Sequence, residues 1–353
     1  MPTTLALAED RSRPDYKTAG DSLQVFSTCP SSLTTPDDYI HRIADVARWS
    51  ESAGCTGILV YTDNSLVDPW LVSQIIIQST HSLCPLIAVQ PVYMHPYAVA
   101  KMVSTLAFLH GRRMFLNMVA GGFKTDLAAL NDTTPHDSRY QRLVEYTRII
   151  QELLCSRSPV TFDGQFYNVK NLTLKPALNP EFFPGILMSG SSEAGMAAAK
   201  ETGAIAVQYP EPPRDSHVDA STEHGPRGVR IGIVTRPRQE AAWEVALARF
   251  PEDRKGQLTR QLATKMSDSA WHRRLSEIGE QSAEARETYW LHPFENYQTN
   301  CPYLVGSYDN VADELSRYVE LGYRTFILDI PAGEEEFQHI GEVFQAASHR
   351  AGL

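Results

Sequence analysis

Eight short apolar segments recur along the chain, and nearly all of them are followed by an amphipathic segment long enough to form a helix. They are residues 23–28, 55–61, 83–91, 112–121, 183–190, 204–209, 229–235 and 325–330. Only the proline-rich stretch 210–228, after the sixth segment, lacks a helical pattern. Apolar strands that alternate with helices are typical of a parallel sheet covered on both faces. Eight such units predict an α/β fold, a (β/α)8 TIM barrel, with a doubly wound open sheet as the alternative because periodicity does not show closure.

Three segments depart from this alternation. Residues 1–20 are predicted to be a polar N-terminal tail, and residues 21–353 a single barrel domain. Short alternating stretches within residues 156–181 predict a hairpin. Residues 251–300, after the seventh strand, are first charged and then aromatic. Insertions after barrel strands lie at the catalytic face, so we interpret this one as a lid.

The charge balance argues against two classes of partner. The 353 residues include 32 Lys and Arg against 42 Asp and Glu, a formal net charge of −10. Nucleic acids and anionic membranes both require a basic surface. No apolar stretch approaches the ~20 residues that cross a bilayer, and the N-terminus lacks the apolar core of a secretory signal. Five cysteines without a CxxC pair favour free thiols in the cytoplasm over disulfides or a metal site.

Polar residues stand where the predicted strands end, which is where barrel enzymes place their active sites. Thr62, Gln90 and Asn117 are examples. Such residues include few acids and bases, and no triad order is present, so they suit a pocket that holds a reactive cofactor. Asn117 could bond the edge of a planar ring, or it could be a buried asparagine satisfied by a loop.

Small and hydroxylated residues join the fifth strand to its helix in SGSSEAG (189–195). Gly190 leaves room there, and the backbone N–H groups with the hydroxyls of Ser191 and Ser192 suit a phosphate at the helix N-terminus. A tight turn with a serine N-cap is the alternative.

A second group that could reach the same phosphate lies at the start of the long helix predicted from about residue 138 to 154. The hydroxyls of Tyr140 and Ser138, within HDSRY, could join it, and His136 of the same segment is a further cofactor-side candidate. The alternative is that Asp137 or Ser138 in this segment caps the helix, and for these five residues alone capping is the favoured interpretation.

In this order, these segments resemble the bacterial-luciferase-like flavin-dependent monooxygenases, most closely the alkanesulfonate monooxygenase branch. The resemblance runs from about Leu23 to Phe344 and is carried by AGCTGILVYTDNSLVDPWLV, LNMVAGG, HDSRYQRLVEYTRIIQELL, LMSGSSEAGMAAAKETGA, QYPEPP, VGSYDNVADELSRYVELG and FILDIP. It implies a (β/α)8 barrel, a homodimer or homotetramer, and a mobile lid. It also implies FMN supplied reduced by a separate NAD(P)H-dependent flavin reductase, with O2 as cosubstrate.

The resemblance also assigns roles to single residues. It places Tyr140, Ser191 and Ser192 at the flavin phosphate and Asn117 at the flavin ring. It places Arg230 at the substrate, on an arginine that faces the sulfonate in that branch.

Other positions differ from the branch on the substrate side. Tyr209 stands where the branch has a tryptophan, and Leu66 where it has a cysteine. A histidine of the branch becomes Gly232, a tyrosine after the last strand becomes Pro331, and a lid arginine becomes Tyr297. Flavin-side positions are therefore kept and substrate-side positions are changed, which implies a different substrate.

Aromatic residues take the place of a basic cluster in the predicted lid. Trp290, His292 and Tyr297 are the members we assign to the site, with Trp290 beside the substrate and His292 as a proton donor. They suit a larger, less anionic substrate, such as an amine, a thio-compound or a carrier-tethered acyl group. Core packing is the alternative role for such a stripe, and the more frequent one.

Three functions remain open from the sequence. The first is a two-component monooxygenase that uses reduced FMN and O2 on a small organic substrate, with Arg230, His292 and Tyr297 as its catalytic side chains. The second is a deazaflavin-dependent hydride-transfer enzyme on the same barrel. The third is a degenerate barrel that binds flavin or a partner without turnover.

Overall fold

Parallel strands close into a barrel in the computed structural model, which describes residues 22–32, 35–213, 225–258 and 288–353. The barrel strands are β1 (Gln24–Thr28), β2 (Gly57–Val60), β3 (Cys84–Val89), β4 (Phe115–Val119), β7 (Gly185–Ser189), β8 (Ile205–Gln208), β9 (Arg227–Arg236) and β12 (Tyr323–Leu328). Each pairs in parallel with the next, and β12 pairs with β1, which closes the ring. The (β/α)8 barrel is confirmed, and the open-sheet alternative is wrong.

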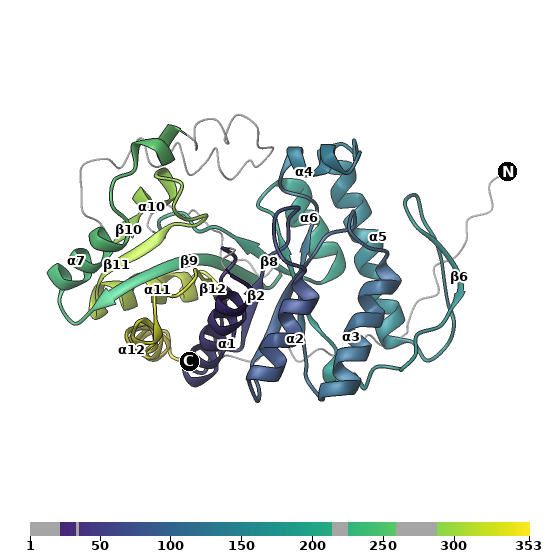
Figure 1. Cartoon of the computed structure of the whole chain (residues 1–353), viewed down its shortest axis with the longest axis horizontal. Coiled ribbons are helices and arrows are strands. Elements are labelled where there is room, and N and C mark those ends of the chain that lie inside the picture. The colour runs from purple at the N-terminus through teal and green to yellow at the C-terminus, as the bar shows by residue number, and fades with distance from the viewer. Residues whose placement is uncertain (1–21, 33–34, 214–224, 259–287) are drawn as a thin grey trace.

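Helices surround the barrel (Figure 1). They are α1 (Pro36–Ser52), α2 (Pro69–Ser79), α3 (Pro96–His110), α5 (His136–Cys155), α6 (Glu193–Thr202), α7 (Gln239–Arg249), α11 (Tyr308–Glu320) and α12 (Glu334–Arg350), with the shorter α4 (Lys124–Ala129), α10 (His292–Glu295) and the 3-10 turn η1 (Pro180–Phe182). The helices α1, α2 and α3 each begin with proline, and Thr35, Asp68 and His95 accept a backbone N–H as their N-caps. Proline fits this position because the first N–H of a helix has no intrahelical partner.

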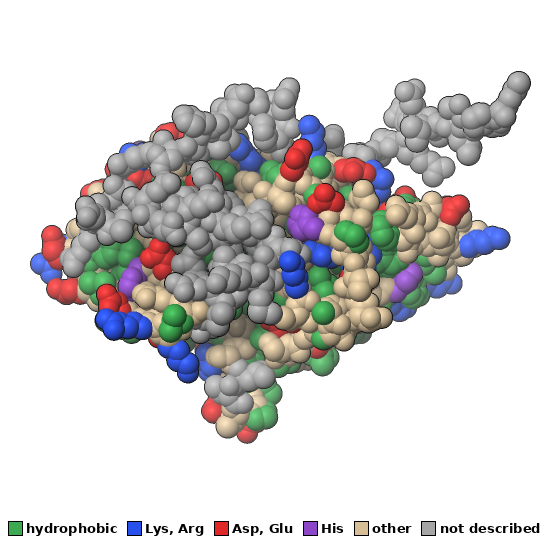
Figure 2. Space-filling model, turned by 90° about the horizontal axis from the view of Figure 1, so that it is seen from above, with side chains coloured by type: hydrophobic (Ala, Val, Ile, Leu, Met, Phe, Trp, Pro, Cys, Tyr) green, Lys and Arg blue, Asp and Glu red, His purple; other side chains and the backbone are tan. Residues whose placement is uncertain are grey.

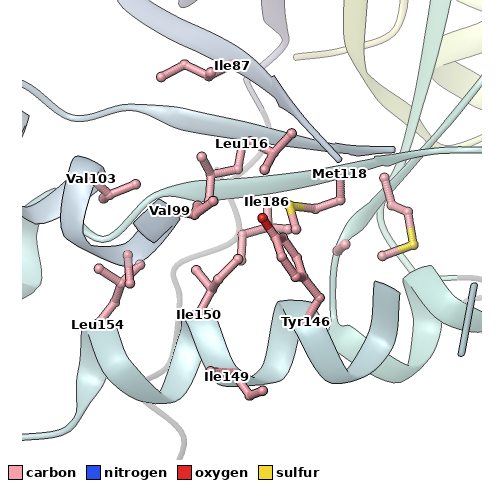
Figure 3. Close-up of a cluster of buried hydrophobic side chains, with 14 of the residues drawn as sticks. Ile87, Val99, Val103, Leu116, Met118, Tyr146, Ile149, Ile150, Leu154 and Ile186 are labelled. Carbon is pink, nitrogen blue, oxygen red and sulfur yellow. The ribbon is translucent and has the colours of Figure 1, made fainter. Parts of the chain in front are cut away.

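The largest apolar cluster lies between the barrel and the pair α3 and α5. Figure 3 shows Val99 and Val103 of α3 and Ile150 of α5 directed toward Leu116 and Ile186 of the sheet. Each of these side chains is at most 8% exposed. Burial of one such side chain stabilises the fold by roughly 2 kcal/mol.

The hairpin expected within residues 156–181 is formed by β5 (Val160–Asp163) and β6 (Asn168–Leu172), which pair antiparallel. It extends outward from the barrel in Figure 1. The Glu145 carboxylate of α5 accepts the N–H groups of Gln165 and Phe166, both at 2.8 Å. The hairpin is thus anchored to a barrel helix.

Two strands outside the barrel ring were not predicted from the sequence. β11 (Tyr303–Ser307) pairs in parallel with the second half of β9, and β10 (Tyr289–Trp290) pairs antiparallel with β11. The first half of β9 serves the barrel, so this long strand has two sets of partners. The predicted lid, residues 251–300, is helical at 254–258 and its middle lies outside the described residues, so the lid stays a prediction.

Three tyrosine hydroxyls hold the start of the proline-rich stretch after β8. Tyr289 donates to the carbonyl of Pro210 and Tyr318 to that of Glu211, both at 2.7 Å. Tyr323 donates to the Gln208 side chain at 3.2 Å. These bonds fix a segment that the sequence correctly marked as non-helical up to Pro213. Within the described segments, no helix is long and apolar enough to cross a membrane.

The Glu51 carboxylate at the end of α1 stabilises the turn that leads into β3. It accepts the N–H groups of His81 at 2.9 Å and Leu83 at 3.0 Å. Burial alone raises the pKa of this carboxyl, but its hydrogen bonds outweigh burial and lower the pKa from 4.5 to about 2. Its contribution to stability is therefore complete above pH ~4.5 and is lost as the pH falls toward 2.

We expect Glu51→Gln to lower the free energy of unfolding by about 1 to 2 kcal/mol at pH 7, because charge-assisted hydrogen bonds are weakened. The difference from the wild type should shrink as the pH falls from 4.5 toward 2. Urea unfolding at several pH values measures it, with Glu244→Gln on the exposed surface of α7 as the control. A loss that is independent of pH would show that the charge is not responsible.

Candidate functional site

The carboxyl ends of the barrel strands meet at one face, and the loops that follow them interlock. Gln90 after β3 donates to the carbonyl of Thr62 after β2 at 3.3 Å. Asn64 is bound from both sides, since its side chain accepts from Tyr93 at 2.8 Å and its backbone N–H donates to Asp126 at 3.2 Å. The sequence did not single out this triple contact, because its members come from three separate loops. The network fixes the shape of one side of the barrel mouth.

Asn117 lies at the mouth on β4 and is 5% exposed. Its side-chain oxygen accepts the hydroxyl proton of Ser189, at the end of the neighbouring β7, at 2.8 Å. The bond orients the asparagine directly beside the loop 189–195. Asn117 is therefore satisfied by a strand partner and still borders the predicted phosphate loop.

Tyr140 of α5 packs across the loop 189–195. A Cβ on Gly190 would lie 2.3 Å from the Tyr140 hydroxyl, and a Cβ on Gly195 would lie 3.2 Å from the tyrosine ring. The hydroxyl also bonds the side chain of Ser192. Burial raises the pKa of Tyr140, so the phenol keeps its proton and can donate to an anion. We call Tyr140, Gly190, Ser192 and Gly195 the loop cradle.

The two capping alternatives have different outcomes. Ser192 is the N-cap of α6, since its hydroxyl accepts the N–H of Gly195 at 3.2 Å. Capping of α5 by Asp137 or Ser138 is wrong: the helix begins at His136 after Pro135, with no side-chain cap bond. Proline fixes the entry into the helix instead.

The His136 ring lies beside the loop cradle, with its centroid 5.2 Å from that of Tyr140. Its Nδ1 lies 2.7 Å from the Asp137 carboxylate. Ser191 is half-buried between Gly190 and Ser192 in the same loop. The structure thus brings together the residues predicted for a phosphate, with several hydrogen-bond donors around Gly190.

Arg230 extends from β9 across the mouth and is 8% exposed. Its guanidinium carbon lies 4.7 Å from the ring centre of Tyr61, at the end of β2, and 5.9 Å from that of Tyr209, after β8. A guanidinium nitrogen lies 3.6 Å from an oxygen of Asp329, after β12. Tyr303 donates its hydroxyl proton to the other Asp329 oxygen at 2.9 Å. We call Arg230, Tyr61, Tyr209, Asp329 and Tyr303 the arginine cluster.

Tyr303 occupies the space beside Gly232, where the resemblance implies a histidine. A Cβ on Gly232 would lie 2.2 Å from the tyrosine ring. From the sequence, Asp329 was expected at a strand end and Tyr303 among the aromatic residues of the predicted lid, and neither was given a role. A glycine inside an apolar strand is a signal that another group approaches closely, and here that group is the Tyr303 ring.

Trp290 and His292 join an aromatic group next to the arginine cluster. Their rings stack with centroids 5.3 Å apart and an interplanar angle of 5°. Trp290 also contacts Trp243 edge-on at 5.3 Å, and it packs against the same apolar cluster as Tyr209 and Tyr303. The alternative of core packing therefore holds for part of the Trp290 ring, and His292 is half-buried on its other face.

Tyr297 and Leu66 lie apart from these contacts in the described structure. Tyr297 is 48% exposed and has a backbone φ of 57° after α10. Leu66 is half-buried in the loop after β2.

Within the described residues no group of three His, Cys, Asp or Glu side chains could hold a metal ion. Figure 2, which views the molecule from above, shows acidic and basic side chains interspersed.

Comparisons with known proteins agree with this architecture. The model of the luciferase-like monooxygenase family matches residues 22–325. The chain is 33% identical over 338 residues to the 4-(gamma-L-glutamylamino)butanoyl-(BtrI acyl-carrier protein) monooxygenase BtrO of Niallia circulans, covering 93% of this chain and 98% of the relative.

Two solved structures share the fold. The EDTA monooxygenase EmoA from Chelativorans sp. BNC1 superposes with a TM-score of 0.71 at 14% identity, covering 94% of this chain and 98% of that one. An F₄₂₀-dependent secondary alcohol dehydrogenase superposes with a TM-score of 0.62 at 17% identity, covering 92% and 99%. At these identities the two likenesses show the barrel alone. The family match and the similarity to BtrO over nearly the whole length show more: the chain belongs to the luciferase-like monooxygenase family.

Proposed function

We propose that this protein is a two-component monooxygenase that uses reduced FMN and O2, with the FMN reduced by a separate NAD(P)H-dependent flavin reductase. The proposed substrate is a small acyl chain, carried as a thioester on a carrier protein. The observation that carries the cofactor proposal is the loop cradle, where the Tyr140 hydroxyl lies against Gly190 in the loop that leads into α6. We further propose a cytoplasmic homodimer or homotetramer. All five cysteines are free thiols, as suits a reducing compartment.

The residues at the mouth fit FMN. A phosphate requires several donors, which Ser191, Ser192, Tyr140 and the α6 backbone N–H groups offer around Gly190. The planar ring would lie toward Asn117, whose orientation is fixed by Ser189. His136 would border the phosphate through its contact with Tyr140. Thr62 and Gln90 would border the ring from the other side of the mouth.

The proposed acyl substrate is supported by BtrO, which the name of that relative describes as acting on an acyl group carried by a carrier protein. It is also supported by the aromatic side chains around the arginine cluster. Trp290 and Tyr209 would cover the acyl chain and exclude water, while Arg230 would bind a polar group of it. An alkanesulfonate would need an uncompensated positive site, which Asp329 removes here.

The cofactor and the side chains of the barrel would have different tasks in the proposed reaction. Reduced FMN supplies the electrons that activate O2, with one oxygen atom entering the substrate and the other leaving as water. The barrel must hold the ring, orient the substrate and keep bulk water away. His292, stacked on Trp290, is the proposed proton donor near the aromatic group. Tyr297 and Leu66 would contribute only at the edge of the pocket in the described arrangement.

The first test is an anaerobic titration of the purified protein with reduced and then with oxidised FMN, followed by addition of O2 and a carrier-bound acyl substrate. We expect preferential binding of reduced FMN and a product heavier by one oxygen atom. Binding without a product in a screen of acyl, amine and thio-compounds would favour the non-catalytic barrel. Failure to bind FMN in either redox state would overturn the proposal.

A second candidate function is hydride transfer with a deazaflavin. The specific observation is the shared barrel of the F₄₂₀-dependent alcohol dehydrogenase. The same titration with coenzyme F₄₂₀ in place of FMN separates the two. Binding of F₄₂₀ with alcohol-dependent reduction of the coenzyme, and no binding of reduced FMN, would select this alternative.

A further inference from the structure

The arginine cluster places a positive charge in a nearly dry position at the mouth of the barrel. The Arg230 side chain is 10% exposed and lies over the Tyr61 ring. A buried guanidinium without a counter-charge would favour any anion that enters the pocket. The charge of the surrounding side chains therefore sets whether this part of the barrel mouth is positive or neutral.

Asp329 supplies the counter-charge, and Tyr303 holds it in place. The Asp329 side chain is 12% exposed, and one of its oxygens lies 3.6 Å from the guanidinium. The other oxygen accepts the Tyr303 hydroxyl at 2.9 Å. Burial and then the charge of Asp329 raise the pKa of Tyr303 well above its ordinary value, so the phenol remains a donor. The tyrosine itself is fixed, because it is 1% exposed and packed against Gly232.

Hydrogen bonding in the cluster is incomplete. Within the described residues, Arg230 Nε and Tyr61 Oη are buried and have no hydrogen-bond partner. Buried polar atoms are usually paired, so such atoms at a pocket mouth indicate a partner that binds there. A neutral group that both donates and accepts can satisfy such atoms without unbalancing the Arg230–Asp329 pair. An added anion would instead be held by Arg230 but repelled by Asp329.

We propose that Asp329, positioned by Tyr303, is a specificity-determining residue that makes this end of the pocket select an uncharged carboxamide group over a carboxylate or sulfonate. The inference deepens the proposed function, because it takes the arginine cluster as the substrate side of the same site. The inference concerns the end of the acyl chain that would lie at the arginine cluster. The end that reacts would lie on the flavin side.

The test is equilibrium binding of two probes that differ only in charge, hexanamide and hexanoate, to the full-length protein by calorimetry at pH 7. We expect the wild type to bind hexanamide about tenfold more tightly than hexanoate. In Asp329→Asn the ratio should shift by at least about tenfold toward hexanoate, because the Arg230 charge is then uncompensated. Asp309→Asn, on the exposed surface of α11, is the matched control and should keep the wild-type ratio.

Two further variants identify the charge that is responsible. The gain in hexanoate binding should disappear in Arg230→Gln/Asp329→Asn, which lacks both charges. Arg230→Gln alone should gain binding of hexylamine, since Asp329 is then unpaired, and this keeps the test valid if Asp329→Asn does not fold. An unchanged ratio in Asp329→Asn, a gain that persists in the double variant, or no binding of either probe by the wild type would overturn the inference. If Asp329→Asn shifts the ratio of hexanamide to hexanoate binding but the wild type shows no FMN-dependent oxygenation, the inference on Asp329 is supported and only the proposed function is refuted.

Discussion

Replacing Gly190 by alanine should lower the affinity for reduced FMN by about 100-fold. The new methyl group would lie 2.3 Å from the Tyr140 hydroxyl, so the phenol must leave the loop cradle. The charge-assisted hydrogen bond from the Tyr140 hydroxyl to the phosphate would be lost, which costs up to about 3 kcal/mol. Anaerobic fluorescence titration of the purified variant with reduced FMN measures the effect.

The matched control is Gly341→Ala on the exposed side of α12, where a Cβ meets nothing within 4 Å. This variant should bind reduced FMN like the wild type. Riboflavin, which lacks the phosphate, should bind wild type and Gly190→Ala with similar affinity. An equal loss for riboflavin and FMN would show that Gly190 does not act through the phosphate.

We expect Gly232→Ala to lower the free energy of unfolding by about 3 kcal/mol, at the upper end of what overpacking costs. The added methyl would lie 2.2 to 2.5 Å from three atoms of the Tyr303 ring, which has little room to move because it is buried against Phe250 at 4.8 Å. The Tyr303–Asp329 hydrogen bond should break as the ring is displaced. Denaturant unfolding gives the change in stability.

The loss of unfolding free energy caused by the added methyl should depend on the presence of the Tyr303 ring. In a Tyr303→Ala background the ring is gone and a cavity remains, so Gly232→Ala should cost less than about 1 kcal/mol there. The four proteins form a double-mutant cycle with a coupling of about 2 kcal/mol or more. Additive effects of the two substitutions would show that the ring and the glycine do not compete for the same space.

The barrel could be predicted because each strand and helix carries its own local signal. A run such as residues 57–60 is apolar throughout, and such a run forms a strand that is buried on both faces. The loop cradle could be predicted in part for the same reason, since Gly190, Ser192 and Gly195 lie within six residues of one another. Tyr140 was a candidate from the HDSRY segment and from the resemblance, and the structure places it against that loop.

The strand β11 was not predicted because its residues, Tyr303–Ser307, pair over their full length only with a distant strand, and its other partner, β10, has two residues. Its partner is the second half of β9, about 70 residues earlier, and the end of β9 lies beyond the ring of barrel strands. In the sequence, Tyr303 stands at the end of the aromatic-rich residues 289–303 and carries no strand signal of its own. Its real place, beside Gly232 and bound to Asp329, follows from the register of β11 on β9.

The sequence by itself determined the fold class, the order of the barrel strands and the residue types of the loop cradle, because these depend on periodicity and on neighbours within a few positions. Only the tertiary structure decided the charge balance around Arg230. Arg230, Tyr303 and Asp329 lie on three strands or strand ends, separated by tens of residues, and closure of the barrel brings them within hydrogen-bonding or ion-pair distance. The effect of a buried charge depends on the groups that surround it in space, and a local sequence pattern does not show which groups those are.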